Sequence, residues 1–180
     1  MKLDKRQGGR LLGHSSNLTP KFRVVSGAVY ELNITSDDPP FIYTTMQFTL
    51  VTRNPNKRVS ILYDQLSAFV SYKNQAITPK VILPPLFHKT KSTVALSPVL
   101  GGSTVPVAAE VVNGLVMEEA NYGVVGLRLV LTGKLRYKAA LIRSGHYGIY
   151  VRCDMFVGLK KGFVGQLPPL LGSQACRVDV

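Results

Sequence analysis

The residues best suited to catalysis are a serine, a histidine and an acid in the last third of the chain, Ser144, His146 and Asp154. They are the residue types of a hydrolytic triad, in which an acid orients a histidine that activates a serine. Side chains so close together on one extended strand seldom converge, and the Gly-x-Ser-x-Gly turn that exposes such a serine is absent from the sequence. A hydrolase is therefore kept only as an alternative. We predict that the protein is not an enzyme and has no catalytic residues.

The residues that could bind a metal are also few. The sequence has three histidines and two cysteines, which are His14, His88, His146, Cys153 and Cys176. None has the spacing to another that is typical of structural zinc sites. We therefore predict no metal site and no cofactor.

The two cysteines and two asparagines bear on the compartment. A bridge between Cys153 and Cys176 would close a 24-residue loop and stabilise the fold by about 3 kcal/mol, although two free buried cysteines are the alternative. Asn33 and Asn17 each begin an Asn-x-Thr triplet, the acceptor pattern for N-glycosylation. Pro20 directly follows the triplet of Asn17, which makes that site the poorer candidate. Both features favour an oxidising, secretory compartment.

Composition predicts a soluble globular domain. The chain has 180 residues, of which 46% are hydrophobic and 18% are charged, enough to fill a core and too few charges for a disordered chain. The longest apolar run, Val81–Phe87, is far shorter than the ~20 residues of a membrane-spanning helix. Residues Met1–Arg10 lack the apolar stretch of a signal peptide.

The formal net charge of +12 is unevenly distributed along the chain. Residues 1–23 hold six basic residues and one acid, residues 24–120 hold seven of each, and residues 121–180 hold nine basic residues and two acids. Such a charge favours anionic surfaces, such as acidic lipid headgroups or a pectin-like cell-wall polymer. Nucleic acid is not an expected partner, because the sequence has no recognised reading motif and its aromatic residues do not stand beside the Lys and Arg.

Alternating apolar and polar residues mark several strands, in segments 48–53, 60–64, 66–72, 127–137 and 147–153. Many short strands punctuated by turn residues, such as Asn54-Pro55-Asn56, predict an all-β fold built as a single antiparallel β-sandwich. The window Val111–Ala120 is the only helix-like one, and we interpret it as a strand or loop.

The same alternation predicts which side chains face the core. Those expected inside are Phe48, Leu50, Leu129, Leu131, Ile149 and Val151, while Thr49, Arg128 and Arg152 are expected outside or at the rim. Residues 1–20 carry Gly, Ser and basic residues with few apolar ones, so we predict a flexible basic tail there and a folded domain over residues 21–180.

Several strings, in this order along the chain, resemble one plant family: Phe48–Asp64, Leu96–Gly102, Ser144–Asp154, Lys160–Phe163 and Leu171–Val180. The family is the group-two late embryogenesis abundant domain proteins, in the branch called non-race-specific disease resistance/hairpin-induced-like. The resemblance covers about residues 21–180. It implies a β-sandwich of fibronectin type III-like or immunoglobulin-like topology and brings no catalytic residues with it.

The resemblance also implies a plasma-membrane protein of plant defence and stress responses, with the sandwich on the extracellular face. We therefore expect a non-enzymatic binding or signalling domain with an unidentified protein partner, in a membrane-associated homo- or hetero-oligomer. A soluble desiccation or stress protectant of the same fold is the alternative. An extracellular location would allow a disulfide between Cys153 and Cys176 to persist, and we predict that bond.

One departure from the family concerns the membrane anchor. Members of this branch usually carry a basic tail and a membrane-spanning helix just before the segment that matches Pro20-Lys21-Phe22. Residues Met1–Thr19 cannot span a bilayer. The expectation is that the chain is a truncated or alternatively spliced product, or a soluble relative.

Overall fold

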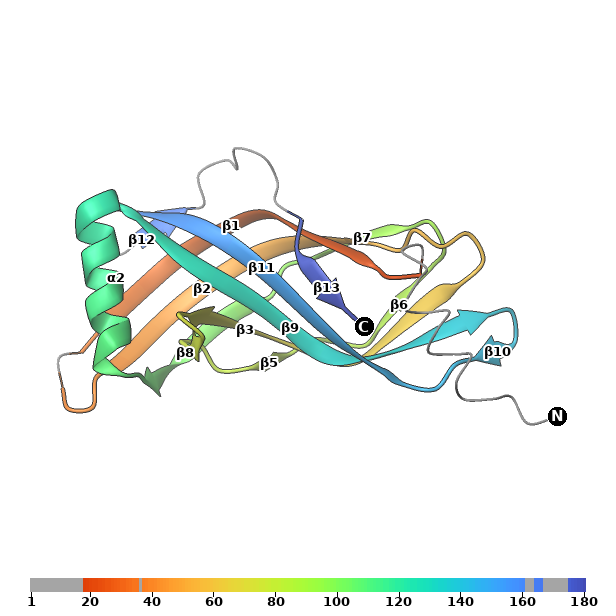
Figure 1. The fold of residues 1–180 in the computed structure, drawn as a ribbon, viewed down its shortest axis with the longest axis horizontal. Coiled ribbons are helices and arrows are strands. Elements are labelled where there is room, and N and C mark those ends of the chain that lie inside the picture. Colours follow the sequence, from red (N-terminus) through yellow and green to blue (C-terminus); the bar gives the residue numbers. More distant parts are fainter. Residues whose placement is uncertain (1–17, 36, 161–163, 167–174) are drawn as a thin grey trace.

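The structure, a computed structural model, describes residues 18–35, 37–160, 164–166 and 175–180. Most of them lie in antiparallel strands around one apolar core, and one end of the strands is covered by helix α2, Ala109–Tyr122 (Figure 1). Residues 1–17 of the predicted tail lie outside the described residues, while Leu18 packs against the core and Pro20 is buried.

Five long strands build two layers, and shorter strands extend them. The long strands are β1 (Lys21–Ile34), β2 (Phe41–Arg53), β3 (Ser60–Tyr72), β9 (Val124–Ala139) and β11 (Tyr147–Lys160). The short strands are β4 (Gln75–Ala76), β5 (Val81–Ile82), β6 (Leu86–His88), β7 (Thr93–Leu96), β8 (Val99–Pro106), β10 (Ile142–Arg143), β12 (Val164–Gln166) and β13 (Arg177–Asp179).

Strand pairing defines the layers. In one layer β9 lies between β3 and β11, and in the other β1 pairs with β2, which pairs in turn with β7 and β8. Strand β12 pairs with both β11 and β1, so the two layers are joined along one edge. Every pairing among the described strands is antiparallel, and the prediction of an all-β sandwich is confirmed.

Buried side chains alternate with more exposed ones along the long strands, as the sequence predicts. All six residues expected in the core are at most 3% exposed, and Thr49, Arg128 and Arg152 are half-buried at the rim. In β2 every second residue from Ile42 to Thr52 is buried. Because alternate side chains of a strand point to opposite faces, each long strand supplies one face to the core and one to the surface.

The long strands also define two ends of the molecule. At one end lie α2 and the connection from β1 to β2, and at the other lie the β2–β3 turn, the β6–β7 turn and the β9–β10 hairpin (Figure 1). The described chain begins at this second end, because the Asn56 side-chain amide donates to the Leu18 carbonyl at 3.3 Å and Lys21 pairs with Arg53.

The interpretation of Val111–Ala120 as a strand or loop is wrong, because these residues belong to α2. Helix α2 buries Val111 and Leu115, which are one helical turn apart, and ends at Gly123 in the left-handed region with φ 62°. Glycine is an unfavourable residue inside a helix, and Gly114 lies within α2. In the structure Gly114 lets the helix approach Tyr72, since a Cβ added at Gly114 would lie 2.5 Å from the Tyr72 hydroxyl.

A bulge in β3 sets the pairing at the centre of its layer. The register between β3 and β9 shifts between Asp64 and Ser67, and Gln65 has φ 52°. Opposite the bulge stands Gly133 of β9, where an added Cβ would lie 2.7 Å from the Leu66 Cα and 2.8 Å from the Gln65 carbonyl oxygen. Both atoms belong to the backbone, so neither can swing aside.

Replacing Gly133 with alanine therefore tests this contact. We expect Gly133→Ala to lower the free energy of unfolding by about 2 kcal/mol, because the bulge must move to admit the methyl group. The matched control is Gly148→Ala in β11, where an added Cβ meets nothing within 4 Å and which we expect to change stability by less than ~0.5 kcal/mol. Urea denaturation of both variants measures the difference, and equal stabilities would show that the bulge does not depend on Gly133.

Candidate functional site

The residues of the hydrolase alternative do not meet as a triad. The Ser144 hydroxyl accepts from the Tyr137 backbone N–H at 2.9 Å and donates to the Gly145 carbonyl at 2.8 Å. The Asp154 carboxylate accepts from Arg128 at 2.7 Å. Each group is thus held by a partner of its own, and the geometry offers no nucleophile activated by a base.

His146 has partners that the sequence did not indicate. A histidine at the entry of a strand usually bonds to backbone groups. Instead, the Arg136 Nε lies 2.8 Å from His146 Nε2, and the Asp64 carboxylate lies 3.7 Å from the same nitrogen. The ring is part of an exposed side-chain cluster, and Ser144 is the residue that bonds to the backbone.

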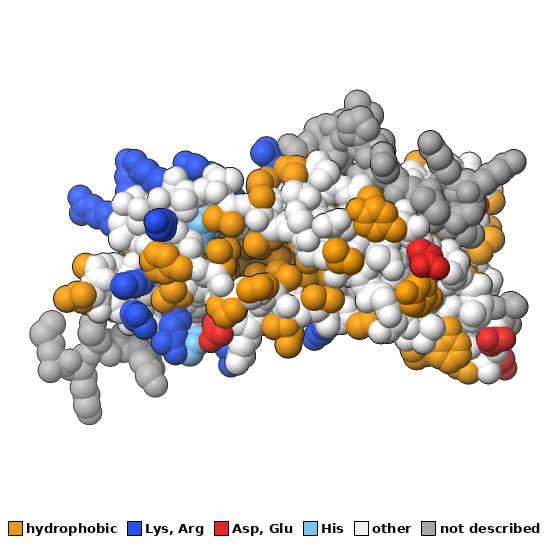
Figure 2. All heavy atoms as spheres, turned by 180° about the vertical axis from the view of Figure 1, so that it is seen from behind, with side chains coloured by type: hydrophobic (Ala, Val, Ile, Leu, Met, Phe, Trp, Pro, Cys, Tyr) orange, Lys and Arg blue, Asp and Glu red, His pale blue; other side chains and the backbone are white. Residues whose placement is uncertain are grey.

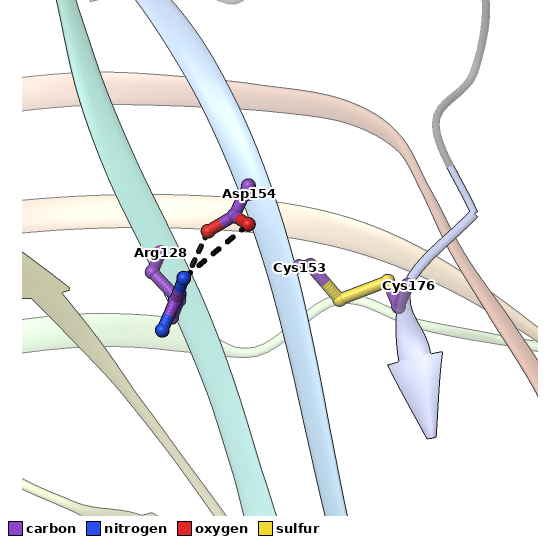
Figure 3. The surroundings of a disulfide bond; sticks show 4 residues. All are labelled: Arg128, Cys153, Asp154 and Cys176. Atoms are coloured by element: carbon purple, nitrogen blue, oxygen red, sulfur yellow. Dashed lines mark hydrogen bonds and ion pairs between the residues drawn. A yellow bond between two sulfur atoms is a disulfide. The ribbon is translucent and has the colours of Figure 1, made fainter.

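The two cysteines are joined in a disulfide that ties the C-terminal segment to both layers (Figure 3). The Cα atoms of Cys153 and Cys176 are 4.4 Å apart, and Cys153 is 3% exposed. The Cys176 N–H donates to the Phe22 carbonyl of β1 at 2.9 Å, while β13 pairs with β11. On the other face of β11, Asp154 binds Arg128 and raises the pKa of that guanidinium through the hydrogen bond.

Three buried titratable groups lie inside the end of the sandwich that is remote from α2. His88 is fully buried with its Nε2 2.8 Å from the Ser92 carbonyl, and burial lowers the pKa of its imidazole. Burial also raises the pKa of Tyr63 and raises the pKa of Tyr137 to about 12. These groups are therefore neutral at pH 7, and they add no charge beneath the surface of this end.

Surface cations gather at this same end, which we call the basic end. Its Lys and Arg residues come from the strand ends and turns there, and they are Lys21, Arg23, Arg53, Lys57, Arg58, Lys89, Lys91, Lys134, Arg136, Lys138 and Arg143. The carboxylate of Asp64, on a described strand of this end, lies among these cations. Figure 2 shows most of the visible Lys and Arg side chains toward one end and most of the visible acidic side chains toward the other.

The opposite end is acidic. Its carboxylates flank α2 and the β1–β2 connection, and they are Glu31, Asp37, Asp38, Glu110, Glu118 and Glu119. This division cannot be seen from the numbers of charges along the sequence. Residues 24–120 hold equal numbers of acids and bases, but the antiparallel strands send most of the bases to one end and most of the acids to the other.

Strand pairing at the basic end places like charges opposite each other. Lys21 of β1 lies directly opposite Arg53 of β2, and Arg143 of β10 lies opposite Lys138 of β9. Like charges in directly opposed positions destabilise a sheet. An anion bound between them would relieve this repulsion, so the arrangement favours an anionic ligand.

The turn that carries Lys57 and Arg58 is held rigidly. The Asn54 side-chain amide is fully buried and donates to the Val59 carbonyl at 2.9 Å and to the His88 carbonyl at 3.2 Å. Its carboxamide oxygen accepts from Asn56. The predicted turn at Asn54-Pro55-Asn56 is thus a structural support that fixes the β2–β3 turn against β6.

The predicted glycosylation sites have different outcomes. Asn33 is exposed on β1 toward the acidic end, and its Nδ2 donates to the Glu31 carboxylate at 2.8 Å. Asn17 lies outside the described residues. Glycosylation at either site stays a prediction.

Among the residues that the structure describes, no three His, Cys, Asp or Glu side chains gather in a way that could hold a metal ion. The fold and this surface together define a β-sandwich domain with two oppositely charged ends. Comparison with known proteins assigns it: residues 49–154 match the family model of the late embryogenesis abundant protein family (LEA_2), and the chain belongs to this family.

Curated relatives from Arabidopsis thaliana agree. NDR1/HIN1-like protein 12 is 33% identical over 78% of this chain and 65% of its own length, and NDR1/HIN1-like protein 1 is 31% identical over 77% and 66%. NDR1/HIN1-like protein 26 is 32% identical over 88% of this chain and 73% of its own. The chain therefore spans about two thirds of the length of the first two relatives. Within the described residues no helix is long and apolar enough to cross a lipid bilayer.

We expect the disulfide to contribute measurably to the free energy of unfolding. Replacing Cys153 and Cys176 together with alanine should lower the free energy of unfolding by about 3 kcal/mol, because the unfolded chain loses the constraint of its loop. Denaturation in the presence and absence of a reductant measures this. The reductant should destabilise the natural chain and leave the double variant unchanged, and a natural chain indifferent to reduction would contradict the prediction.

Proposed function

We propose that the chain is a non-enzymatic binding and signalling domain of a plasma-membrane-associated plant defence and stress-response protein, exposed to the extracellular side. Membership of the late embryogenesis abundant family, with relatives named NDR1/HIN1-like, supports a role in plant stress or defence. The Cys153–Cys176 disulfide supports an oxidising compartment, because such bonds are rare in the cytosol.

The segregation of charge is the observation that carries the binding function. A surface of one sign attracts ions and surfaces of the other, and each Lys or Arg close to an anionic membrane contributes about 1 kcal/mol. The basic end presents its cations together, whereas the acidic end would be repelled. The domain thus binds an anionic lipid surface through its basic end and points α2 away from it.

The end of the sandwich at which the described chain begins supports the same orientation. Leu18 lies at the basic end, and the sequence that precedes it contains the further cations Lys2, Lys5, Arg6 and Arg10. Asn33 lies toward the opposite end, where a glycan would not come between the domain and the surface. The acidic end remains open to protein partners.

Charge reversal at the two ends tests this proposal on the full chain. We expect Lys57→Glu with Arg58→Glu to weaken binding to vesicles of neutral and anionic phospholipid by roughly thirtyfold, since two favourable cations are lost. The control, Lys73→Glu with Lys80→Glu, lowers the formal net charge by the same amount, from +12 to +8, because each substitution changes it by two units. Its two positions lie away from the basic end. We expect it to weaken binding less than about threefold. Vesicle co-sedimentation gives the affinities.

Three results would contradict the proposal. Equal losses in the two variants would show that net charge, not the basic end, drives binding. Binding that is unaffected by salt would exclude an electrostatic origin. Binding to polygalacturonate without binding to anionic vesicles would assign the basic end to a cell-wall polymer.

A further inference from the structure

The β9–β10 hairpin projects at the basic end (Figure 1), and the residues at its tip are apolar. Ala139 pairs with Ile142 and Lys138 with Arg143, so Ala140 and Leu141 form a two-residue turn. Leu141 is 96% exposed and Ile142 is 76% exposed. Leu141 thus contributes nothing to the core, and together with its neighbour Ile142 it forms an apolar tip exposed to solvent.

The turn itself uses residues that do not favour it. Ala140 has φ 53°, in the left-handed region that glycine, asparagine and aspartate adopt most readily. The β3–β4 hairpin has a turn of the same length, and there the two positive-φ residues are the polar Lys73 and Asn74. A turn that breaks both the conformational and the polarity preference, with no gain in packing, is typical of a functional position.

Cations flank this tip on both strands. Lys138 and Arg143 lie directly opposite each other, where their charges repel. The Lys138 ammonium lies 5.9 Å from the centre of the Phe87 ring, which is itself 46% exposed. An apolar tip between paired cations matches the interface of an anionic bilayer, in which acyl chains lie directly beneath a layer of phosphates.

We propose that Leu141 and Ile142 insert into the headgroup region of an anionic bilayer while Lys138 and Arg143 contact the lipid phosphates. This insertion rests on the proposed membrane binding of the basic end and gives it a point of contact. A lipid surface fits the tip better than an acidic polysaccharide does, because a hydrated polymer offers no apolar phase in which Leu141 can be buried.

The absence of tryptophan from the sequence provides a direct test. Leu141→Trp places a single fluorescent reporter at the tip, and Tyr122→Trp places one at a position of α2 that is 76% exposed. With vesicles of neutral and anionic phospholipid, we expect the emission at 141 to move to shorter wavelength and to be quenched by brominated acyl chains. The emission at 122 should not change.

A second pair of variants measures the contribution of the tip to affinity. We expect Leu141→Ser with Ile142→Ser to weaken vesicle binding about tenfold or more, since burial of an aliphatic side chain is favourable. Ile82→Ser, which removes a side chain that is 79% exposed on β5, should leave binding unchanged. The four residues replaced in these variants are all exposed, and they are Leu141, Ile142, Ile82 and Tyr122. Thermal unfolding should therefore be nearly the same throughout.

The outcomes separate the insertion from the proposed function. Co-sedimentation with anionic vesicles but no spectral change at 141 would overturn the insertion and leave surface binding intact. The absence of co-sedimentation would overturn both. A spectral change that appears at high protein concentration without vesicles would show that the tip contacts a second copy of the chain, and this also overturns the insertion.

Discussion

The pairing of β9 between β3 and β11 is the constraint on which the rest of the structure depends. Its buried leucines, Leu129 and Leu131, set the register on both sides, and the bulge opposite Gly133 allows the strand to continue beyond it. Past that point Leu135 and Tyr137 still face inward, so the cations that alternate with them, Lys134, Arg136 and Lys138, face out. A slip of one residue would exchange these faces and bury charge. The core therefore determines where the basic end presents its charges.

The same pairing explains why the basic end costs stability. Opposed cations repel, and a positive-φ alanine at the hairpin tip adds strain. Stable burial elsewhere offsets these costs: the core runs the length of the sandwich, and the disulfide fixes the C-terminal segment to it. The well-packed interior thus holds an electrostatically unfavourable surface in place at one end of the sandwich.

Much of the fold could be predicted from the sequence, because strands with one buried face leave a period-two pattern, as in Phe48–Arg53. Strand β1 was harder, since bulges at Val24/Ser26 and Val29/Glu31 interrupt that pattern. Helix α2 was missed because the need for Gly114 arises from Tyr72, a contact between distant segments. The basic end was missed for a similar reason: its cations are far apart in the sequence and meet only when the strands pair.

We propose that the domain meets an anionic surface with one end only. Hydrogen exchange of the full chain, with and without anionic vesicles, tests this most directly because it reports on every described segment at once. We expect slower exchange at the β2–β3 turn, the β6–β7 turn and the β9–β10 hairpin, and unchanged exchange in α2. Protection of α2, or protection spread evenly over both ends, would contradict it.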